Sequence, residues 1–321
     1  MDEFTQPSRN PGEETPVFWR YIPSPQPAER PKYRLSLLLF LLTFLATLLV
    51  GTQLALSFRL SGPTAGGLEF FIAVLEHPLV LVYGLAFALA IMGILLAHEL
   101  GHYLACRYYG ISATLPYFIP FPNLIGTMGA FIRIRSHFPQ RRALFDVGIA
   151  GPLAGFLVAV PTLLLSLPHS KIIQVDPSEM AISFGEPLIF KLAAWFFQLQ
   201  TPPGKDLYIH PVAFAAWVGF FATALNLLPM GQLDGGHIVY ALFGKYHRQI
   251  SLGFALVVIP ALMFFFWSPW IVWALIPLLL GIHHPPTLDD GIPLDPARKG
   301  IALAGLLVFI LCFIPAPIVI H

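Results

Sequence analysis

Charged side chains are scarce in this chain of 321 residues. Asp, Glu, Lys and Arg make up 11% of it, whereas hydrophobic residues make up 56%. This composition excludes an ordinary soluble domain, in which about a quarter of the residues are charged, and is typical of a polytopic membrane protein. The formal net charge of +1 gives no sign of a nucleic-acid or acidic partner.

Cysteine is scarce as well. The two cysteines, Cys106 and Cys312, lie next to or within apolar runs. They provide neither a disulfide framework nor a cysteine-based zinc site. A secretory signal peptide is not expected either, because the first apolar run begins near Leu35, which is too late, and is too long.

Long apolar runs are what the sequence has in abundance. They follow a polar, proline-rich stretch at 1–33, which we predict to be a disordered cytoplasmic tail. The runs lie at about 35–58, 79–106, 143–167, 211–243, 249–267, 270–283 and 300–320. Because 270–283 is short for a membrane span, we predict an all-α polytopic protein with six or seven transmembrane helices. Residues 186–199 predict an amphipathic helix at the membrane interface.

The basic residues predict an orientation. With the tail in the cytoplasm, only Arg59, Lys171, Lys191 and Lys205 of the 18 Lys and Arg residues would lie outside. The positive-inside rule therefore favours a cytoplasmic N-terminus.

Residues 98–102 read H-E-L-G-H at the end of the second apolar run. On a helix, His98 and His102 share one face and can hold one zinc ion, with Glu99 beside them as general base. Ionisable groups within a membrane span are costly and indicate function. The motif therefore predicts a zinc site inside the membrane.

Two histidines leave zinc short of the three protein ligands that catalytic sites normally have. Asp234 is the first candidate, because the topology places it at a depth similar to that of the histidines, and Asp146 is the second. The glycines and Pro229 around Asp234 predict a broken helix, which membrane depth tolerates only inside protein or beside a wet cavity. His237 is a candidate partner of the ligands. Asn226 has two readings, a bond between helices or an amide aimed at the oxyanion of the reaction.

The loop 107–142 contains TLPYFIPFPNLIGTMGAFIRIRS, which predicts a short β-hairpin at the membrane interface with Gly126 and Gly129 around its turn. Two roles are open. The loop is either a structural re-entrant segment, or its edge near Phe131 and Ile132 binds an unwound substrate as an added strand.

Four segments together resemble the site-2 protease family of intramembrane zinc metalloproteases. They are AHELGHYLA (97–105), GTMGAFIRI (126–134), GIAGPLAGF (148–156) and NLLPMGQLDGGH (226–237). The resemblance implies that His98, His102 and Asp234 bind zinc, that Glu99 is the catalytic base and that Asn226 assists the substrate or intermediate. It also implies an active site toward the cytosol and a bacterial-type member without PDZ or CBS modules. Small residues of the third segment, Gly151, Ala154 and Gly155, predict close packing against the zinc helices.

We therefore expect a membrane zinc endopeptidase that holds one Zn²⁺ per chain and cuts peptide bonds in or near transmembrane segments of membrane proteins. The expected division is a tail (1–33), a first helix with its outer loop (34–78), a metalloprotease core (79–243) and additional C-terminal helices (244–321). A bacterial inner membrane is the expected location, with regulated intramembrane proteolysis as the role.

Two rivals are open. A prenyl-protein-processing type of protease would need a distant glutamate, and only Glu179 and Glu186 follow Glu99. A non-proteolytic metal-binding protein or transporter would have no need of the base Glu99.

Overall fold

The computed structural model describes residues 33–62, 66–174, 182–199, 201–202, 204–273, 275, 281 and 285–320. The expected tail, apart from Tyr33, and most of the 270–283 run lie outside the described residues.

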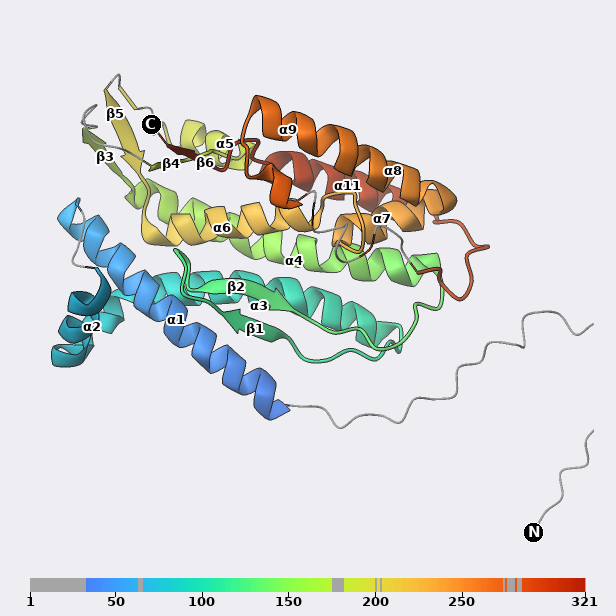
Figure 1. Ribbon diagram of the computed structural model, residues 1–321, viewed down its shortest axis with the longest axis horizontal. Helices are drawn as coiled ribbons and strands as arrows, with labels where there is room; N and C mark the ends of the chain where they lie inside the picture. The colour runs from blue at the N-terminus through green and yellow to red at the C-terminus, as the bar shows by residue number, and fades with distance from the viewer. Residues whose placement is uncertain are drawn as a thin grey trace, which may run out of the picture. The chain divides into compact units, whose positions relative to one another are not determined.

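The described part is mostly helical (Figure 1). Four helical stretches in it are long and apolar enough to cross a membrane: Tyr33–Leu60, Pro78–Tyr108, Arg141–His169 and Asp234–Phe265. The first is α1. The second joins a 3₁₀ turn, Pro78–Gly84, to α3 (Leu85–Tyr108), and the third joins α4 (Arg141–Ser166) to the turn Leu167–His169. By length and apolar character, four spans are therefore found among the described residues, where six or seven were expected for the whole chain.

The run predicted at 211–243 is divided, which corrects its reading as one segment. Helix α6 (Pro211–Asn226) ends at Asn226, and α7 (Asp234–Phe243) begins seven residues after Leu227. Pro229 lies between them, where it cannot donate a helical hydrogen bond. Helix α7 ends at Gly244, which has a φ of +52°. The next helix, α8 (His247–Gly253), continues through the π-helical turn Phe254–Val258 into α9 (Ile259–Phe265).

Helix α4 is central to the packing, because it contacts α3, α6, α7 and α11 (Pro296–Cys312). Figure 1 shows α4 and α6 running side by side. The contact with α3 is very close at Gly101, where an added Cβ would lie 2.8 Å from the carbonyl carbon of Ala150. Small residues allow such an approach between apolar helices.

The predicted hairpin is present. Strands β1 (Tyr117–Pro120) and β2 (Thr127–Phe131) are antiparallel, with Tyr117 opposite Phe131. Helix α1 covers β1, and the rings of Phe40 and Phe118 meet edge to face at 5.2 Å. The hairpin thus lies between α1 and α3, and α3 contacts β2 (Figure 1).

The segments after α4 contain strands that the hydrophobic pattern did not indicate. Strand β3 (Lys171–Gln174) pairs with β5 (Lys205–Tyr208), and β4 (Ile182–Phe184) pairs with β6 (Ile318–Ile320). The last apolar run, predicted as 300–320, therefore includes most of α11 and the strand β6. Two further helices are short, α2 (Gly67–Glu76) and α5 (Leu188–Phe196). Helix α5 lies within residues 186–199, where an amphipathic interface helix was expected.

Candidate metal centre

Three side chains from two helices converge on one point. The Nε2 atoms of His98 and His102 on α3 each lie 3.3 Å from Oδ2 of Asp234 on α7. Among the described residues these three form the one group of potential metal ligands whose donor atoms all lie within 4.8 Å of one another. The histidines are buried, with exposed fractions of 5% and 7%.

This arrangement fits a zinc ion. Ligands about 2.0–2.1 Å from a tetrahedral zinc lie roughly 3.3 Å from one another, which matches both distances to the carboxylate oxygen. Two imidazoles and one carboxylate also form a donor set that catalytic zinc sites use, with a fourth position left for water or substrate. The residues present therefore suit this metal.

Helix α3 and its neighbours fix the imidazole rings. The spacing of four residues places both rings on one face of α3, with ring centroids 4.9 Å apart. Nδ1 of His102 lies 2.7 Å from the carbonyl oxygen of Val147 on α4. A hydrogen bond donated by Nδ1 leaves Nε2 as the lone-pair donor, as a metal ligand requires.

Asp234 owes its position to the break between α6 and α7. It is the first residue of α7, so the loop before it sets the place of its carboxylate. Gly236 allows α7 to start against this loop, because an added Cβ would lie 2.9 Å from the carbonyl oxygen of Met230. A regular helix through 226–234 would separate Asp234 from Asn226 by roughly 12 Å along the axis.

Two glycines of α4 make room for the histidine rings. A Cβ at Gly151 would lie 2.5 Å from both Cδ2 and Cε1 of His102, and one at Gly155 would lie 3.3 Å from Nδ1 of His98. A Cβ at Gly148 would meet Cβ of His237 at 2.9 Å. The expected close packing of GIAGPLAGF against the histidines is therefore present at Gly151 and Gly155, and Gly148 also packs closely, against His237.

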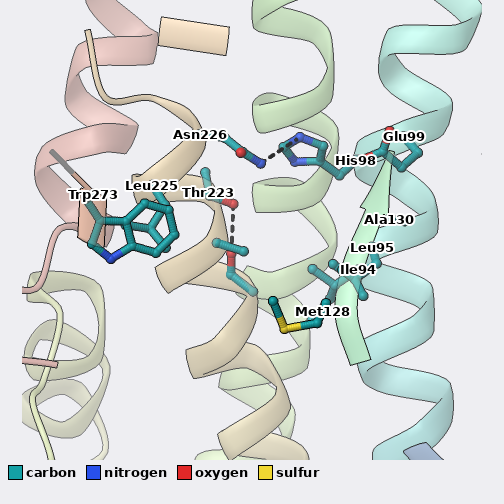
Figure 2. A pocket seen from close by; sticks show the side chains of 13 residues that line it. Ile94, Leu95, His98, Glu99, Met128, Ala130, Thr223, Leu225, Asn226 and Trp273 are labelled. Atoms are coloured by element: carbon teal, nitrogen blue, oxygen red, sulfur yellow. Dashed lines mark hydrogen bonds between the residues drawn. The ribbon is translucent and has the colours of Figure 1, made fainter. Parts of the chain in front are cut away.

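Asn226, the last residue of α6, lies beside the cluster. Its Nδ2 is 3.3 Å from Nε2 of His98, and Figure 2 shows the amide pointing at that ring. Helix α6 thus carries the amide to the edge of the histidine and aspartate cluster. Both readings of Asn226 stay open, because this contact joins two helices and also places the amide beside the cluster.

A cavity of about 190 Å³ opens next to these groups (Figure 2). His98, Glu99 and Asn226 line it together with residues of β2, α3 and α6 and with Trp273. Glu99 is 7% exposed, and its carboxylate lies close to the backbone of Ile132. The glutamate of the H-E-x-x-H motif therefore lines the same cavity as His98 and Asn226.

A sequence comparison identifies the family. The model of peptidase family M50 matches residues 86–268, which include all the residues of the metal cluster. The chain belongs to peptidase family M50. The resemblance to site-2 proteases is thereby confirmed.

Named relatives of this M50 chain are plant proteins. "Probable zinc metalloprotease EGY1, chloroplastic" of Arabidopsis thaliana is 30% identical over 256 residues, 77% of this chain and 45% of the relative. "Probable zinc metalloprotease EGY2, chloroplastic" of Oryza sativa subsp. indica is 38% identical over 195 residues, 58% of this chain and 34% of the relative. The chain thus spans less than half the length of these curated relatives.

Asp146, the second candidate ligand of the M50 chain, is outside the cluster. Asp146 binds the guanidinium of Arg298 at 2.6 Å and accepts a hydrogen bond from the hydroxyl of Tyr109. The ring of His237 lies beside that of Phe138, at 6.0 Å between centroids. Glu186 is outside the cluster, and Glu179 is not among the described residues.

The β1–β2 hairpin lines the cavity of the M50 chain, but its two glycines are not both at the turn, as was expected. Gly126 lies in the turn, with φ of +79°, and an added Cβ there would meet the α1 backbone at Thr47 at 2.8 Å. Gly129, with φ of +101°, lies within β2 and lines the cavity, so the two glycines do not bracket the turn. Phe131 pairs with Tyr117, and Ile132 follows β2.

Sequence reasoning missed the wall of the cavity opposite β2. Trp273 and Ala222 line the cavity, yet neither stands in a motif, and Trp273 lies beyond the part of the chain that the family model matches. An alanine or tryptophan within an apolar run has no signal that distinguishes a cavity wall from an ordinary packed residue.

Proposed function

We propose that this chain is an intramembrane zinc metalloendopeptidase that hydrolyses peptide bonds in or near transmembrane segments. The observation that carries the proposal is the convergence of His98, His102 and Asp234 at one end of an apolar cavity that Glu99 also lines. The names of the plant relatives support zinc and proteolysis, as probable metalloproteases.

In this proposal His98, His102 and Asp234 hold one zinc ion per chain. Bound there, zinc supplies the Lewis-acid chemistry common to catalytic zinc sites. Glu99 accepts the proton of the attacking water and returns it to the leaving amine. The amide of Asn226 donates to the oxygen that becomes negative as the peptide carbonyl is attacked.

The substrate strand binds along β2 in this proposal. The backbone of Ile132 faces Glu99, and backbone groups alternate in direction along a strand. Ala130 therefore also directs its N–H and C=O away from β1, toward the cavity that it lines. A transmembrane helix hides its peptide bonds in its own hydrogen bonds, and an added strand would expose them to the base.

We further propose six or seven spans for the whole chain. The four long apolar stretches, α6 and α11 make six, and the run at 270–283 is the candidate for the seventh. The basic residues support a cytoplasmic N-terminus and an active site toward the cytoplasm. The core would comprise 79–243, with 34–78 before it and 244–321 after it. A bacterial inner membrane is the proposed location, and release of a membrane-tethered regulator after an earlier cut is the proposed role.

A non-proteolytic metal-binding protein or transporter is the alternative, and Glu99→Gln decides between them. The amide is nearly isosteric with the carboxylate but does not accept the proton of water at neutral pH. We expect purified Glu99→Gln protein to keep about one zinc per chain and to lose cleavage of single-span substrates by a factor of at least about 100. Zinc is measured by mass spectrometry and cleavage by gel and product mass.

Glu69→Gln is the matched control, because Glu69 is exposed on α2. This variant should cleave as the unaltered protein does. Wild-type protein that binds zinc but cuts no single-span substrate would support the transporter or binding reading. Turnover by Glu99→Gln close to that of the unaltered protein would remove Glu99 from the role of base.

The strand proposal needs a test that does not disturb the hairpin, since proline at Ile132 would also change the backbone that lies beside Glu99. We therefore place the change in the substrate. N-methylation of one backbone amide at a time removes one donor, and in an added strand alternate amides face β2. Cleavage should fall at every second position near the cut, and equal sensitivity at all positions would contradict strand addition.

A further inference from the structure

The cavity beside the metal cluster has two chemically different ends. His98, Glu99 and Asn226 provide the polar end. The rest of the lining is mainly apolar and comes from three helical segments and β2, and it includes Ile94, Leu95, Met128, Ala130, Leu225 and Trp273. Figure 2 shows Met128 and Ile94 on the β2 side and Trp273 next to Leu225 on the other.

The apolar end offers nothing to a charged side chain. Of the described residues that line the cavity, only His98 and Glu99 carry ionisable groups, and both belong to the metal-binding motif. The hydroxyl of Thr223 donates to the carbonyl oxygen of Gly219 at 2.8 Å, so its proton is already engaged. A buried charge without a partner is strongly unfavourable, so the lining selects against charged side chains.

Trp273 forms the wall opposite β2, and its neighbours fix it there. It packs against a cluster that includes Leu225 and Trp270. Trp270 is buried, stacks on Phe313 at 5.7 Å and donates its indole N–H to the carbonyl oxygen of Pro315 at 2.6 Å. The position of Trp273 thus depends on the chain after α11, outside the residues that the family model matches.

The size of the cavity sets an upper limit on what enters. An apolar cavity of about 150 Å³ accepts a benzene ring in another protein. The present cavity, at about 190 Å³, is large enough for one branched aliphatic or aromatic side chain. Ala222, on α6, contributes only a methyl group to the lining, so a larger side chain at this position would reduce the space in the cavity.

We propose that this cavity is the specificity pocket of the enzyme and receives one bulky apolar side chain, of the size of leucine or phenylalanine, from a substrate residue next to the bond that is cut. Ala222 and Trp273 determine the size of the accepted side chain. This inference rests on the proposed proteolytic function and adds to it the class of substrate sequence.

The test uses the full chain in detergent and synthetic single-span peptides as probes. Each peptide is a leucine and alanine segment of about 20 residues, unwound at its centre by Asn-Gly. Guest residues Ala, Leu, Phe, Trp, Asp or Lys occupy each flank of the cut in turn, and the cut is located by product mass. On one flank, peptides with a Leu or Phe guest should be cleaved at least about tenfold faster than the peptide with an Ala guest, since even one methylene in an apolar pocket has such an effect. Peptides with an Asp or Lys guest should be cleaved more slowly than the one with Ala.

Two variants change the pocket. Ala222→Phe should fill it and lower the Leu-to-Ala and Phe-to-Ala rate ratios at least about tenfold, while cleavage of the Ala guest continues. Trp273→Ala should enlarge it and raise the rate for the Trp guest relative to Leu. The matched control Ala86→Phe places the same ring on an exposed position of α3 and should leave all the ratios unchanged.

The possible failures are separable. Cleavage by the unaltered protein with no preference among the guests at either flank would overturn the pocket but not the protease, whereas zinc-loaded protein that cuts no guest would overturn both. Equal loss for all guests in Ala222→Phe, with zinc retained, would also overturn the pocket. Should Ala222→Phe lose its zinc or its fold, Trp273→Ala decides, and an unchanged order of guests in that variant would refute the proposal.

Binding gives a readout without turnover. Glu99→Gln protein is mixed with a peptide that carries benzoylphenylalanine at the selective flank, and light then couples the ring to nearby C–H bonds. We expect crosslinks to residues of the apolar end, such as Met128 and Trp273. Crosslinks confined to the outer helices would contradict the pocket.

Discussion

Two regions contact α4 by opposite means. Toward α3 and α7 it presents glycines, and the imidazole rings lie where side chains would otherwise be. Toward α11 it presents Asp146, which Arg298 reaches with a long, flexible side chain. Glycine contacts fix a distance closely because backbone and ring are rigid, whereas an ion pair made by the long side chain of Arg298 tolerates small shifts. The metal cluster therefore lies against the stiffer of the two contacts.

Asp234 and Asp146, the two candidates for the third ligand, differ in the partners that they already have. Asp234 faces two imidazole nitrogens, each at 3.3 Å, in the cluster. Asp146 is already bonded to a guanidinium and a phenol, and its side chain is 25% exposed. The charge of the Asp146 carboxylate is balanced by arginine, which also holds it in place, so Asp146 is a poor candidate for a ligand at the histidine cluster.

The largest expected effect comes from removing each aspartate in turn. Asp234→Ala should lower zinc from about one ion per chain to a small fraction of that, because two histidines alone are too few ligands. Asp146→Ala should keep its zinc. Metal content after gel filtration measures both, and the opposite pattern would make Asp146 the ligand.

A smaller effect should follow from filling the space beside His102. Gly151→Ala places a methyl group within the van der Waals radius of the imidazole ring, so the ring must move and zinc affinity should fall by about 10–100-fold, as for other disturbed ligand supports. Zinc competition with a chelator measures the affinity. Gly93→Ala on α3, where a Cβ meets nothing within 4 Å, is the control and should keep normal affinity. Equal affinities in the two variants would show that the glycine contact does not position the ring.

The ion pair should matter for stability and not for metal. Arg298→Ala leaves Asp146 without its cation, and we expect a loss of about 1–3 kcal/mol in unfolding free energy with zinc retained. Thermal unfolding in detergent provides the comparison. Lys299→Ala, at an exposed position of the same helix, should change stability little. Zinc loss in Arg298→Ala would mean that the two regions are coupled.

The smallest effect concerns Asp290, in the segment between the long helices and α11. Burial disfavours its carboxylate, but hydrogen bonds from Thr287 and Tyr240 and the charge of Arg141 outweigh burial, so the pKa of Asp290 lies below its ordinary value. Such a group stabilises the fold above its ordinary pKa of about 3.9, and this contribution is lost as the pH falls through the lower folded value.

Asp290→Asn should therefore be less stable than the unaltered protein at pH 7, by less than about 1 kcal/mol. The difference should shrink as the pH falls below about 4 and disappear once the pH is below the lowered folded pKa. Unfolding curves across this range provide the measurement. A difference that persists at low pH would assign the effect to shape and not to charge.

Several elements were predictable from local pattern alone. The apolar runs located α1, α3 and α4, and alternation with turn residues located the β1–β2 hairpin. The division at 227–233 was foreseen only as a broken helix, and the strands β4 and β6 were not foreseen at all. Their pairing joins Ile182–Phe184 to Ile318–Ile320, and no local pattern states which distant segment a strand will meet.

The sequence by itself determined the chemistry: His98, Glu99 and His102 share one helix, and four-residue spacing is enough to bring the two rings together. Family membership also followed from sequence. The tertiary structure brought Asp234, the first candidate, and not Asp146, to the histidines, and it alone decided that Ala222 and Trp273 line the cavity beside Glu99. The physical reason is that helical spacing acts over a few residues, whereas the approach of α7 and of Trp273 to α3 depends on packing between segments more than 100 residues apart.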